Sequence, residues 1–372
     1  MAQLSRSDES FLGSWWWSVD RWTISAIGIL ICVGFIMMQA ASPAVAQRLG
    51  LSWDAFILRQ VGFLLAAGLV TVGVSMLSPA DIRRLAMLGG IMALILTAAT
   101  MVVGHEIKGA RRWVSLPGMS VQPSEFLKPC FAVTAAYLIA QWQQERRYGG
   151  MIAAGCIFAV IAMLLMKQPD VGMVVVITAV FIIQLFVGGL HLAFMGALVG
   201  LAGGGAVLAY KWSDHVRGRI EKFFHHTGDN YQVNTAMEAF GNGGLFGRGP
   251  GEGRVKDVLP DAHADFVFAV TGEEFGLMLC LVIVALFAFI VLRGLLRLLR
   301  EQDPFIVIAS AGLVGGFGLQ ACVNMASTMG AIPTKGMTLP LISYGGSSAI
   351  AVALGMGMLL GLTRHRPREQ AP

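Results

Sequence analysis

Charge is scarce in this sequence. Of its 372 residues only 13% are Asp, Glu, Lys or Arg, whereas 56% are hydrophobic. A water-soluble domain of this length needs a larger polar surface. The composition therefore argues against an ordinary soluble protein and predicts one whose main solvent is lipid.

Cysteine motifs and export signals are also missing. The five cysteines fall in apolar runs without CxxC spacing, which argues against a disulfide framework or a zinc site and favours small buried side chains. The polar N-terminus lacks a short basic and apolar segment followed by a cleavage site of small residues. We therefore expect no cleaved signal peptide and a first span that stays in the membrane.

Long apolar runs, in contrast, are abundant. A helix needs about 20 mostly apolar residues to cross a bilayer. Ten such runs predict an all-α fold, a polytopic bundle of ten transmembrane helices in a single integral membrane domain over residues 1–372. The predicted spans are 22–42, 56–77, 85–103, 123–141, 150–166, 171–188, 190–210, 267–292, 305–326 and 344–362. The longest connection, 211–266, is a loop between spans seven and eight.

Basic residues indicate the orientation, because Lys and Arg in short loops are retained on the cytoplasmic side. Arginines follow the second, fourth and eighth predicted spans and recur in the C-terminal tail. This pattern predicts an inner-membrane protein whose N-terminus (1–21) and tail (363–372) are both cytoplasmic. The long loop 211–266 is then periplasmic.

The two outer segments, 104–122 and 211–266, are nevertheless rich in Lys and Arg. One interpretation is attraction of an anionic, lipid-linked substrate. The other is that long loops cross the membrane regardless of charge. Helical spacing over 212–224 predicts a basic helix in the membrane interface, and 231–240 is a second helical candidate. The glycine-rich run 241–251 lacks the strand and the ending of a P-loop, which favours a flexible connection lining a groove.

Asp265 stands where the long loop meets span eight. A carboxylate at this depth is partly desolvated, and desolvation raises its pKa toward the range of a general base. The alternative is a residue that caps the helix or complements its dipole. Ionisable residues at membrane depth are often functional, which favours the general base for Asp265. Glu273 and Glu274 follow about two turns further into the span.

Three further elements place polar groups at outer helix boundaries. Glu125 and Lys128 are three residues apart at the start of span four and can pair on one helix face. Asp170 begins span six, either as a cap or as a functional group. Residues 333–348 have the Pro and Gly spacing of irregular backbone, which is tolerated at membrane depth only where it is buried or faces water. If these elements converge with Asp265, they form a polar cavity open to the outside.

The ordered set of motifs resembles the SEDS family (shape, elongation, division, sporulation) over nearly the whole chain. The stretches that carry the resemblance are 109–113, 122–128, 168–172, 240–249, 260–276 and 333–348. The segment PTKGMTLPLISYGGSS (333–348) is similar to the division branch of the family rather than to the elongation branch. Ser120 and Val121 depart from the pattern, since some division-branch members carry a basic residue there.

This resemblance implies a peptidoglycan glycosyltransferase that polymerises lipid II, a disaccharide pentapeptide on undecaprenyl diphosphate, at the outer face of the membrane. The partners it implies are a class B penicillin-binding protein, which is a transpeptidase, and other division proteins at the septum. Membrane lipid is a further partner and nucleic acid is not. The family's essential acidic residue falls on Asp265, and its paired Glu and Lys fall on Glu125 and Lys128.

We therefore expect Asp265 to be the general base that accepts a proton from the attacking sugar hydroxyl. Several cationic groups are expected to stabilise the leaving diphosphate. The residues predicted to bind the substrate are Arg111, Glu125, Lys128, Asp170, Lys256, Lys335 and Ser343. A divalent cation, Mg²⁺ or Mn²⁺ held by Asp265 or Asp170, fits the chemistry, whereas no organic cofactor is expected.

Two other functions stay open. A lipid II flippase would place ionisable groups or broken helices near the bilayer midplane, often in two repeated halves. Here the charges lie at the outer ends of the spans and no internal repeat is evident. A non-enzymatic division scaffold would tolerate the loss of Asp265.

Overall fold

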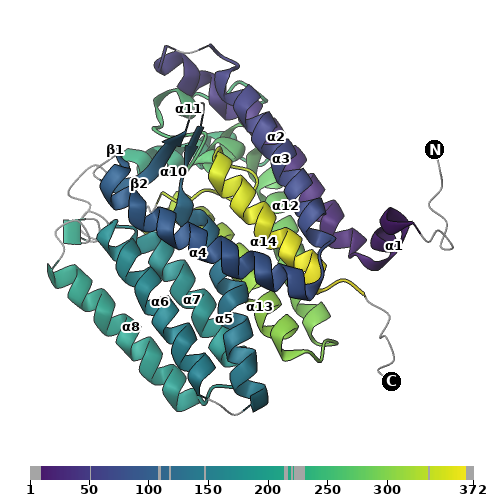
Figure 1. Ribbon diagram of the computed structural model, residues 1–372. Helices are drawn as coiled ribbons and strands as arrows, with labels where there is room; N and C mark the ends of the chain where they lie inside the picture. Colours follow the sequence, from purple (N-terminus) through teal and green to yellow (C-terminus); the bar gives the residue numbers. More distant parts are fainter. Residues whose placement is uncertain are drawn as a thin grey trace.

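The computed structural model of the chain describes residues 10–50, 52–107, 110–116, 119–145, 148–212, 217–218, 221, 231–333 and 336–365. These residues form a bundle of long helices with a small β-sheet at one end (Figure 1). The long helices are α2 (Arg21–Arg48), α3 (Ala55–Ser75), α4 (Pro79–Val103), α5 (Pro123–Glu145), α6 (Gly149–Lys167), α7 (Val171–Val187), α8 (Leu192–Trp212), α12 (Val267–Leu298), α13 (Pro304–Thr328) and α14 (Gly346–Leu362). Every predicted span corresponds to one of these helices.

Several of these helices have the dimensions of membrane spans. Within the described ranges, six are long and apolar enough to cross a bilayer: α2, α3, α4, α6, α12 and α13. The apolar helices α7 and α14 are shorter. The chain is thus a helical protein with several apolar spans, and the count of ten membrane crossings stays a prediction.

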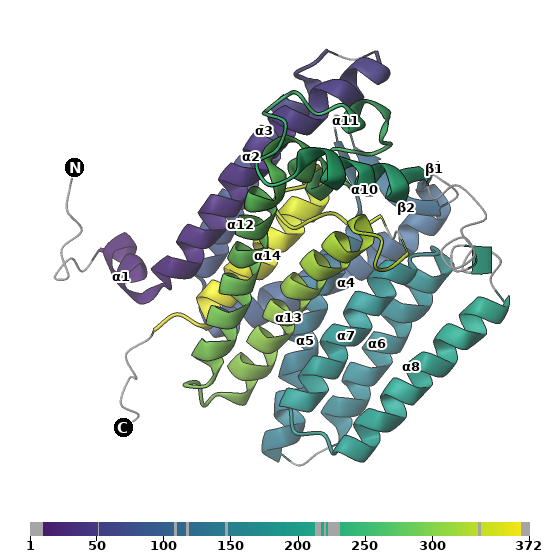
Figure 2. The same ribbon diagram turned by 180° about the vertical axis from the view of Figure 1, so that it is seen from behind.

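Helix α5 lies at the centre of the bundle, where it packs against α4, α6, α7, α13 and α14 (Figures 1 and 2). Its buried face is rich in small residues, which allow neighbouring helices to approach closely. They include Cys130, Ala132, Ala135, Ala136 and Ala140. The first turn of α5 therefore sits among several other helix ends, and this turn carries Glu125 and Lys128.

A small antiparallel sheet departs from the all-α expectation. Its strands are β1 (His105–Ile107), β2 (Ala110–Leu116) and β3 (Met119–Val121), in that order, with Val114 opposite Val121. Strict alternation of apolar and polar residues is the sequence signal for a half-buried strand, and the seven residues of β2 do not alternate in this way. The sheet connects α4 to α5 and contacts both helices.

Both termini of the described chain lie at one end of the bundle (Figure 1). The short helix α1 (Phe11–Ser18) precedes α2, and the Trp15 Nε1–H donates to Ser75 Oγ at 2.9 Å. The His365 N–H donates to the carbonyl of Ser18 at 2.9 Å and ties the tail to the N-terminal segment.

The opposite end, called the site end, holds the sheet together with α10 (Tyr231–Gly243) and α11 (Val255–Val258) (Figure 2). The helix predicted over 231–240 is confirmed as α10. Most of the predicted interfacial helix, 212–224, lies outside the described residues.

Helix α12 is broken at Gly276, whose φ of 76° and ψ of −177° are not helical. Backbone hydrogen bonds of 2.9–3.2 Å join this break to the glycine-rich run 241–251. The donor and acceptor pairs are Leu277 N to Gly244 O, Met278 N to Leu245 O, Arg248 N to Glu273 O and Gly249 N to Glu274 O. The run is therefore fixed to a helix, and the expectation of a flexible connection is wrong, because the break supplies backbone partners that the sequence does not reveal.

Candidate active site

Asp265 lies at the site end, in a tight turn that leads into α12. Its N–H donates to the carbonyl of Asp261 at 3.1 Å, and Asp261 has a φ of 52°. The residue that precedes α12 is Phe266, so Asp265 is not the N-cap, and the capping alternative does not describe its place. The carboxylate faces the irregular segment before α14, where its Oδ2 is 3.5 Å from the position of a Cβ on Gly336.

Glu125 and Lys128 form the predicted ion pair in the first turn of α5. The Lys128 Nζ is 2.6 Å from Glu125 Oε2, and each side chain is only 11% exposed. The same carboxylate oxygen accepts a hydrogen bond from Ser348 Oγ at 3.2 Å. Lys128 Nζ also donates to Gln320 Oε1 of α13 at 2.5 Å. The pair is thus held by three helices, α5, α13 and α14.

Two amides on α13 connect this pair to the turn that carries Asp265. Gln320 Nε2 donates to the carbonyl of Thr338 at 3.1 Å. One turn further along, Asn324 Nδ2 donates to the carbonyl of Asp265 at 3.0 Å and to that of Met337 at 2.6 Å. Helix α13 therefore fixes the relative position of Asp265, the irregular segment and the Glu125–Lys128 pair.

Asp170 joins the same region as the helix cap of α7, and its role in binding the substrate stays a prediction. Its carboxylate caps α7 by accepting from the Met173 N–H at 3.3 Å, and it pairs with Arg112 Nη1 at 3.5 Å. Gln122 Nε2, at the start of α5, donates to it at 3.3 Å. Burial raises the pKa of Asp170 above its ordinary value, the charge of Arg112 opposes that rise, and the charge of Glu125 adds to it.

Arg112, rather than the predicted Arg111, reaches this cluster. The Arg112 Nε–H donates to the carbonyl of Gln168 at 2.9 Å, and its Nη2 donates to that of Pro169. Arg111 pairs instead with Glu106 at 3.6 Å, and more than half of each side chain is exposed. Adjacent residues of a strand point to opposite faces, so the choice between the two arginines depends on the strand β2, which the sequence did not reveal.

Three other predicted residues are not part of the described cluster. Lys256 is buried against Glu274, with its Nζ 2.5 Å from Glu274 Oε1. Ser343 Oγ accepts from the Leu339 N–H at 2.8 Å within a buried turn. Their contacts favour structural roles, and substrate binding by either residue stays a prediction. Lys335 lies outside the described residues.

Sequence reasoning missed Gln320, Asn324, Thr338 and Ser348. Gln320 and Asn324 did give a signal, since they are four residues apart in an otherwise apolar span and so share a helix face. Polar side chains inside membrane helices commonly bond across to neighbouring segments, as Gln320 does to α5 and Asn324 does to the Asp265 turn.

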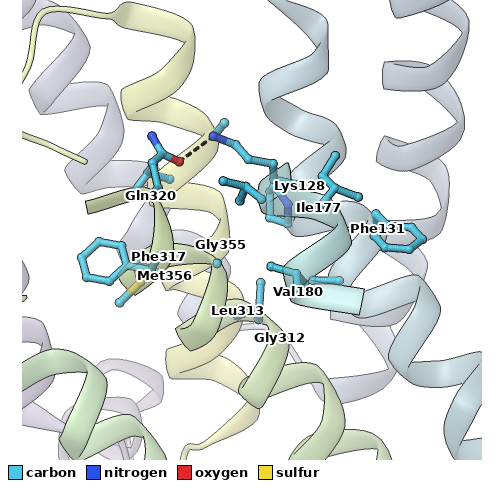
Figure 3. A pocket seen from close by; sticks show the side chains of 16 residues that line it. Lys128, Phe131, Ile177, Val180, Gly312, Leu313, Phe317, Gln320, Gly355 and Met356 are labelled. Carbon is cyan, nitrogen blue, oxygen red and sulfur yellow. Dashed lines mark hydrogen bonds between the residues drawn. The ribbon is translucent and has the colours of Figure 1, made fainter. Parts of the chain in front are cut away.

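An apolar cavity lies directly below the Lys128–Gln320 contact, between α5, α7, α13 and α14 (Figure 3). Figure 3 shows these two polar side chains reaching toward each other above Phe317, Met356 and Leu313. The ion pair therefore lies next to a cavity that is lined mainly by apolar side chains.

The residues present do not form a metal site by themselves. Across the part of the chain that the structure describes, no group of three or more His, Cys, Asp or Glu side chains is placed to hold a metal ion. Asp170 is already engaged by Arg112 and Gln122. The predicted divalent cation stays a prediction, and no chemical step is derived through it.

The long apolar helices define a polytopic membrane protein. At one end of its spans lies a polar site made of a buried ion pair, a loop carboxylate and an irregular polar segment. Residues 21–368 match the family model for FtsW, RodA and SpoVE, described as a cell cycle protein. The chain belongs to this family, the SEDS family.

Similar proteins cover nearly the whole chain. The chain is 42% identical over 365 residues to the probable peptidoglycan glycosyltransferase FtsW of Caulobacter vibrioides, with 98% of this chain and 94% of that protein covered. It is 35% identical to the protein of the same name from Halomonas elongata, with coverages of 95% and 93%.

The fold is similar to solved structures. One is a chain from a structure described as "Structural coordination of polymerization and crosslinking by a peptidoglycan synthase complex", with a TM-score of 0.77, 25% identity, and 93% of this chain and 97% of that chain covered. The other is the crystal structure of RodA from Thermus thermophilus, with a TM-score of 0.68, 25% identity, and coverages of 95% and 99%.

Proposed function

We propose that this protein is a peptidoglycan glycosyltransferase of the division type, which polymerises lipid II into glycan strands and releases undecaprenyl diphosphate. The observation that carries the proposal is the link through α13. Asn324 holds the backbone of the Asp265 turn, and Gln320, one helical turn away, accepts a hydrogen bond from the buried Lys128. The names of the similar proteins from Caulobacter vibrioides and Halomonas elongata support it.

Asp265 acts as the general base in this proposal. A sugar hydroxyl of lipid II attacks the anomeric carbon of the growing strand, and its proton passes to the Asp265 carboxylate. The new C–O bond forms as the bond to the diphosphate oxygen breaks, so the electron pair leaves with undecaprenyl diphosphate. General base catalysis of this kind contributes roughly 10²–10⁴-fold to the rate.

Lys128 stabilises the charge that gathers on the leaving diphosphate. An ammonium group has three N–H donors, and the described residues engage two of them, through Glu125 and Gln320. The third is available to a phosphate oxygen in a largely buried site, where such a contact is stronger than in water. The cavity behind Lys128 is lined mainly by apolar side chains, which favours surroundings poor in water for this charge.

The site end faces the periplasm in this proposal, with ten spans in the inner membrane and both termini cytoplasmic at the septum. The distribution of arginines supports this orientation. Both termini of the described chain lie at the end of the bundle opposite the site end, which agrees with it (Figure 1).

The proposed partner is a class B penicillin-binding protein that crosslinks the strands made here, together with other division proteins. Support comes from the structural similarity to a chain of a peptidoglycan synthase complex in which polymerisation and crosslinking are coordinated.

The test compares two identical substitutions in one turn. Purified Asp265→Asn protein, supplied with the partner and labelled lipid II, should form few or no glycan strands. Asp261→Asn is the matched control, because Asn tolerates the positive φ at that position, and it should retain activity. Strand formation by Asp265→Asn at the wild-type rate would overturn the assignment. Lipid II movement across liposomes that persists in this variant would favour the flippase instead.

A further inference from the structure

Glu273 and Glu274 lie within the first half of α12, between Asp265 and the break at Gly276. They are fully buried, with exposures of 0% and 1%. A buried carboxylate is costly unless it is hydrogen-bonded or paired with a cation. The proposed chemistry uses neither residue, so their surroundings need a separate explanation.

The side chain of Glu273 binds the backbone of the loop at the start of α11. One carboxylate oxygen accepts from the Arg254 N–H at 3.1 Å, and the other accepts from the Val255 N–H at 3.0 Å. Arg248 Nη1 is 3.7 Å from the first of these oxygens. The carboxylate therefore fixes two successive peptide groups of the loop.

The side chain of Glu274 binds the same loop on both sides of these two residues. One oxygen accepts from the Gly251 N–H at 2.7 Å, and the other accepts from Lys256 Nζ at 2.5 Å. Lys256 Nζ also donates to the carbonyl of Gly251 at 2.9 Å and closes the loop on itself. The two carboxylates together hold residues 251–256 against α12.

The loop approaches α12 so closely that glycine is needed at the contact. A Cβ on Gly253 would lie 2.8 Å from Glu274 Cγ, and one on Gly247 would lie 2.2 Å from the carbonyl oxygen of Glu274. The contact with the broken helix thus requires glycine at positions 247 and 253.

The clamped segment leads directly to Asp265. Beyond Lys256, the chain passes through α11, whose C-cap Leu259 is fully buried, and enters the turn of Asp265. On its other side, Arg48 Nη2 of α2 donates to the carbonyl of Leu259 at 3.0 Å. The segment is therefore held from two sides before it reaches Asp265.

We infer that Glu273 and Glu274 are positioning residues, which clamp residues 251–256 onto the broken turn of α12 and thereby fix the Asp265 turn. This inference rests on the proposed glycosyl transfer at Asp265. Loss of either carboxylate frees the loop and lowers kcat, because Asp265 no longer stays in line with the attacking hydroxyl. The KM for lipid II changes little, since neither side chain contacts the substrate.

The experiment measures loop mobility separately from activity. Glu273→Gln and Glu274→Gln proteins are digested with trypsin, which cleaves after Arg248 and Arg254 when the loop opens. Cleavage should be about tenfold faster or more in both variants, because a hydrogen bond to a charged group contributes enough stability for that ratio. Glu252→Gln is the control, since Glu252 is exposed on the same loop, and it should be cleaved at the wild-type rate.

Two further variants keep the outcomes distinct. Asp265→Asn should lose polymerisation while its loop stays protected, which separates the clamp from the proposed base. The double variant Lys256→Met/Glu274→Gln removes both charges of the buried pair, so it should fold even if Glu274→Gln alone does not. Unchanged cleavage in Glu273→Gln and in the double variant overturns the clamp. Fast cleavage with an unchanged kcat overturns the positioning role.

Discussion

The Lys128 ammonium and the Glu125 carboxylate lie 2.6 Å apart in a site that exposes only 11% of either side chain. Removal of one partner from such a pair leaves an uncompensated charge and costs about 3–5 kcal/mol, whereas removal of both is often close to neutral. Single and double substitutions can therefore distinguish the contribution of the pair to stability from its contribution to catalysis.

Lys128→Met and Glu125→Gln should each lower the melting temperature of the purified protein and abolish polymerisation of lipid II. The double variant Lys128→Met/Glu125→Gln should recover most of the melting temperature without recovering activity, because the cation near the diphosphate is still missing. Recovery of activity in the double variant would show that the pair serves the fold alone.

Substitution of the two neighbouring arginines of β2 should affect the stability of the protein to very different extents. Arg112→Ala leaves the buried Asp170 without its cation and two carbonyl groups without a donor, so we expect a loss of about 3 kcal/mol or more of stability. Arg111→Ala removes only an exposed pair with Glu106, which contributes about 0–1 kcal/mol. Thermal unfolding of both variants in the same detergent compares them. Equal losses would contradict the assignment of Arg112.

Local patterns allowed much of the fold and part of the site to be predicted. Apolar runs located the helices, and the spacing of Glu125 and Lys128 predicted their pairing, because both signals depend on residues close in sequence. Arg112 was missed because its face is set by the strand β2, whose residues do not alternate between apolar and polar.

The break in α12 was missed for a different reason. It depends on hydrogen bonds between residues 244–249 and residues 273–278, and no local pattern reveals such a pairing. Gly276 on its own looks like one of the many glycines that let membrane helices pack closely.

Asp20, which precedes α2 at the end of the bundle that holds the termini, should make stability depend on pH. Burial raises its pKa, but hydrogen bonds from Arg293 and Thr23 and the charge of Arg297 outweigh burial and lower the pKa overall. A carboxylate with a lowered pKa in the folded state stabilises the protein above its unfolded pKa of about 3.9, and this contribution is lost as the pH falls through the folded value.

The measurement compares wild-type and Asp20→Asn melting temperatures from neutral pH downward. The wild type should be more stable at pH 7. The difference should shrink as the pH falls below about 4, because the unfolded state binds the proton first and folded Asp20 is protonated only at a lower pH. A difference that stays constant over this range would show that the Asp20 charge does not stabilise the fold.

Gly276→Ala should destabilise the break in α12 even though Ala is normally the better helix former. The φ of 76° is strained for a residue with a Cβ, and the added atom would lie 2.4 Å from both Gly247 N and Leu245 O. Strain of this kind costs about 1–3 kcal/mol before the clash is counted. Gly241→Ala is the matched control, because Gly241 lies within α10 with open space around its Cβ position. There the same substitution should raise stability by up to about 1 kcal/mol. Opposite shifts in melting temperature are therefore expected, and a stabilised Gly276→Ala protein would mean that α12 is continuous rather than joined to the glycine-rich run.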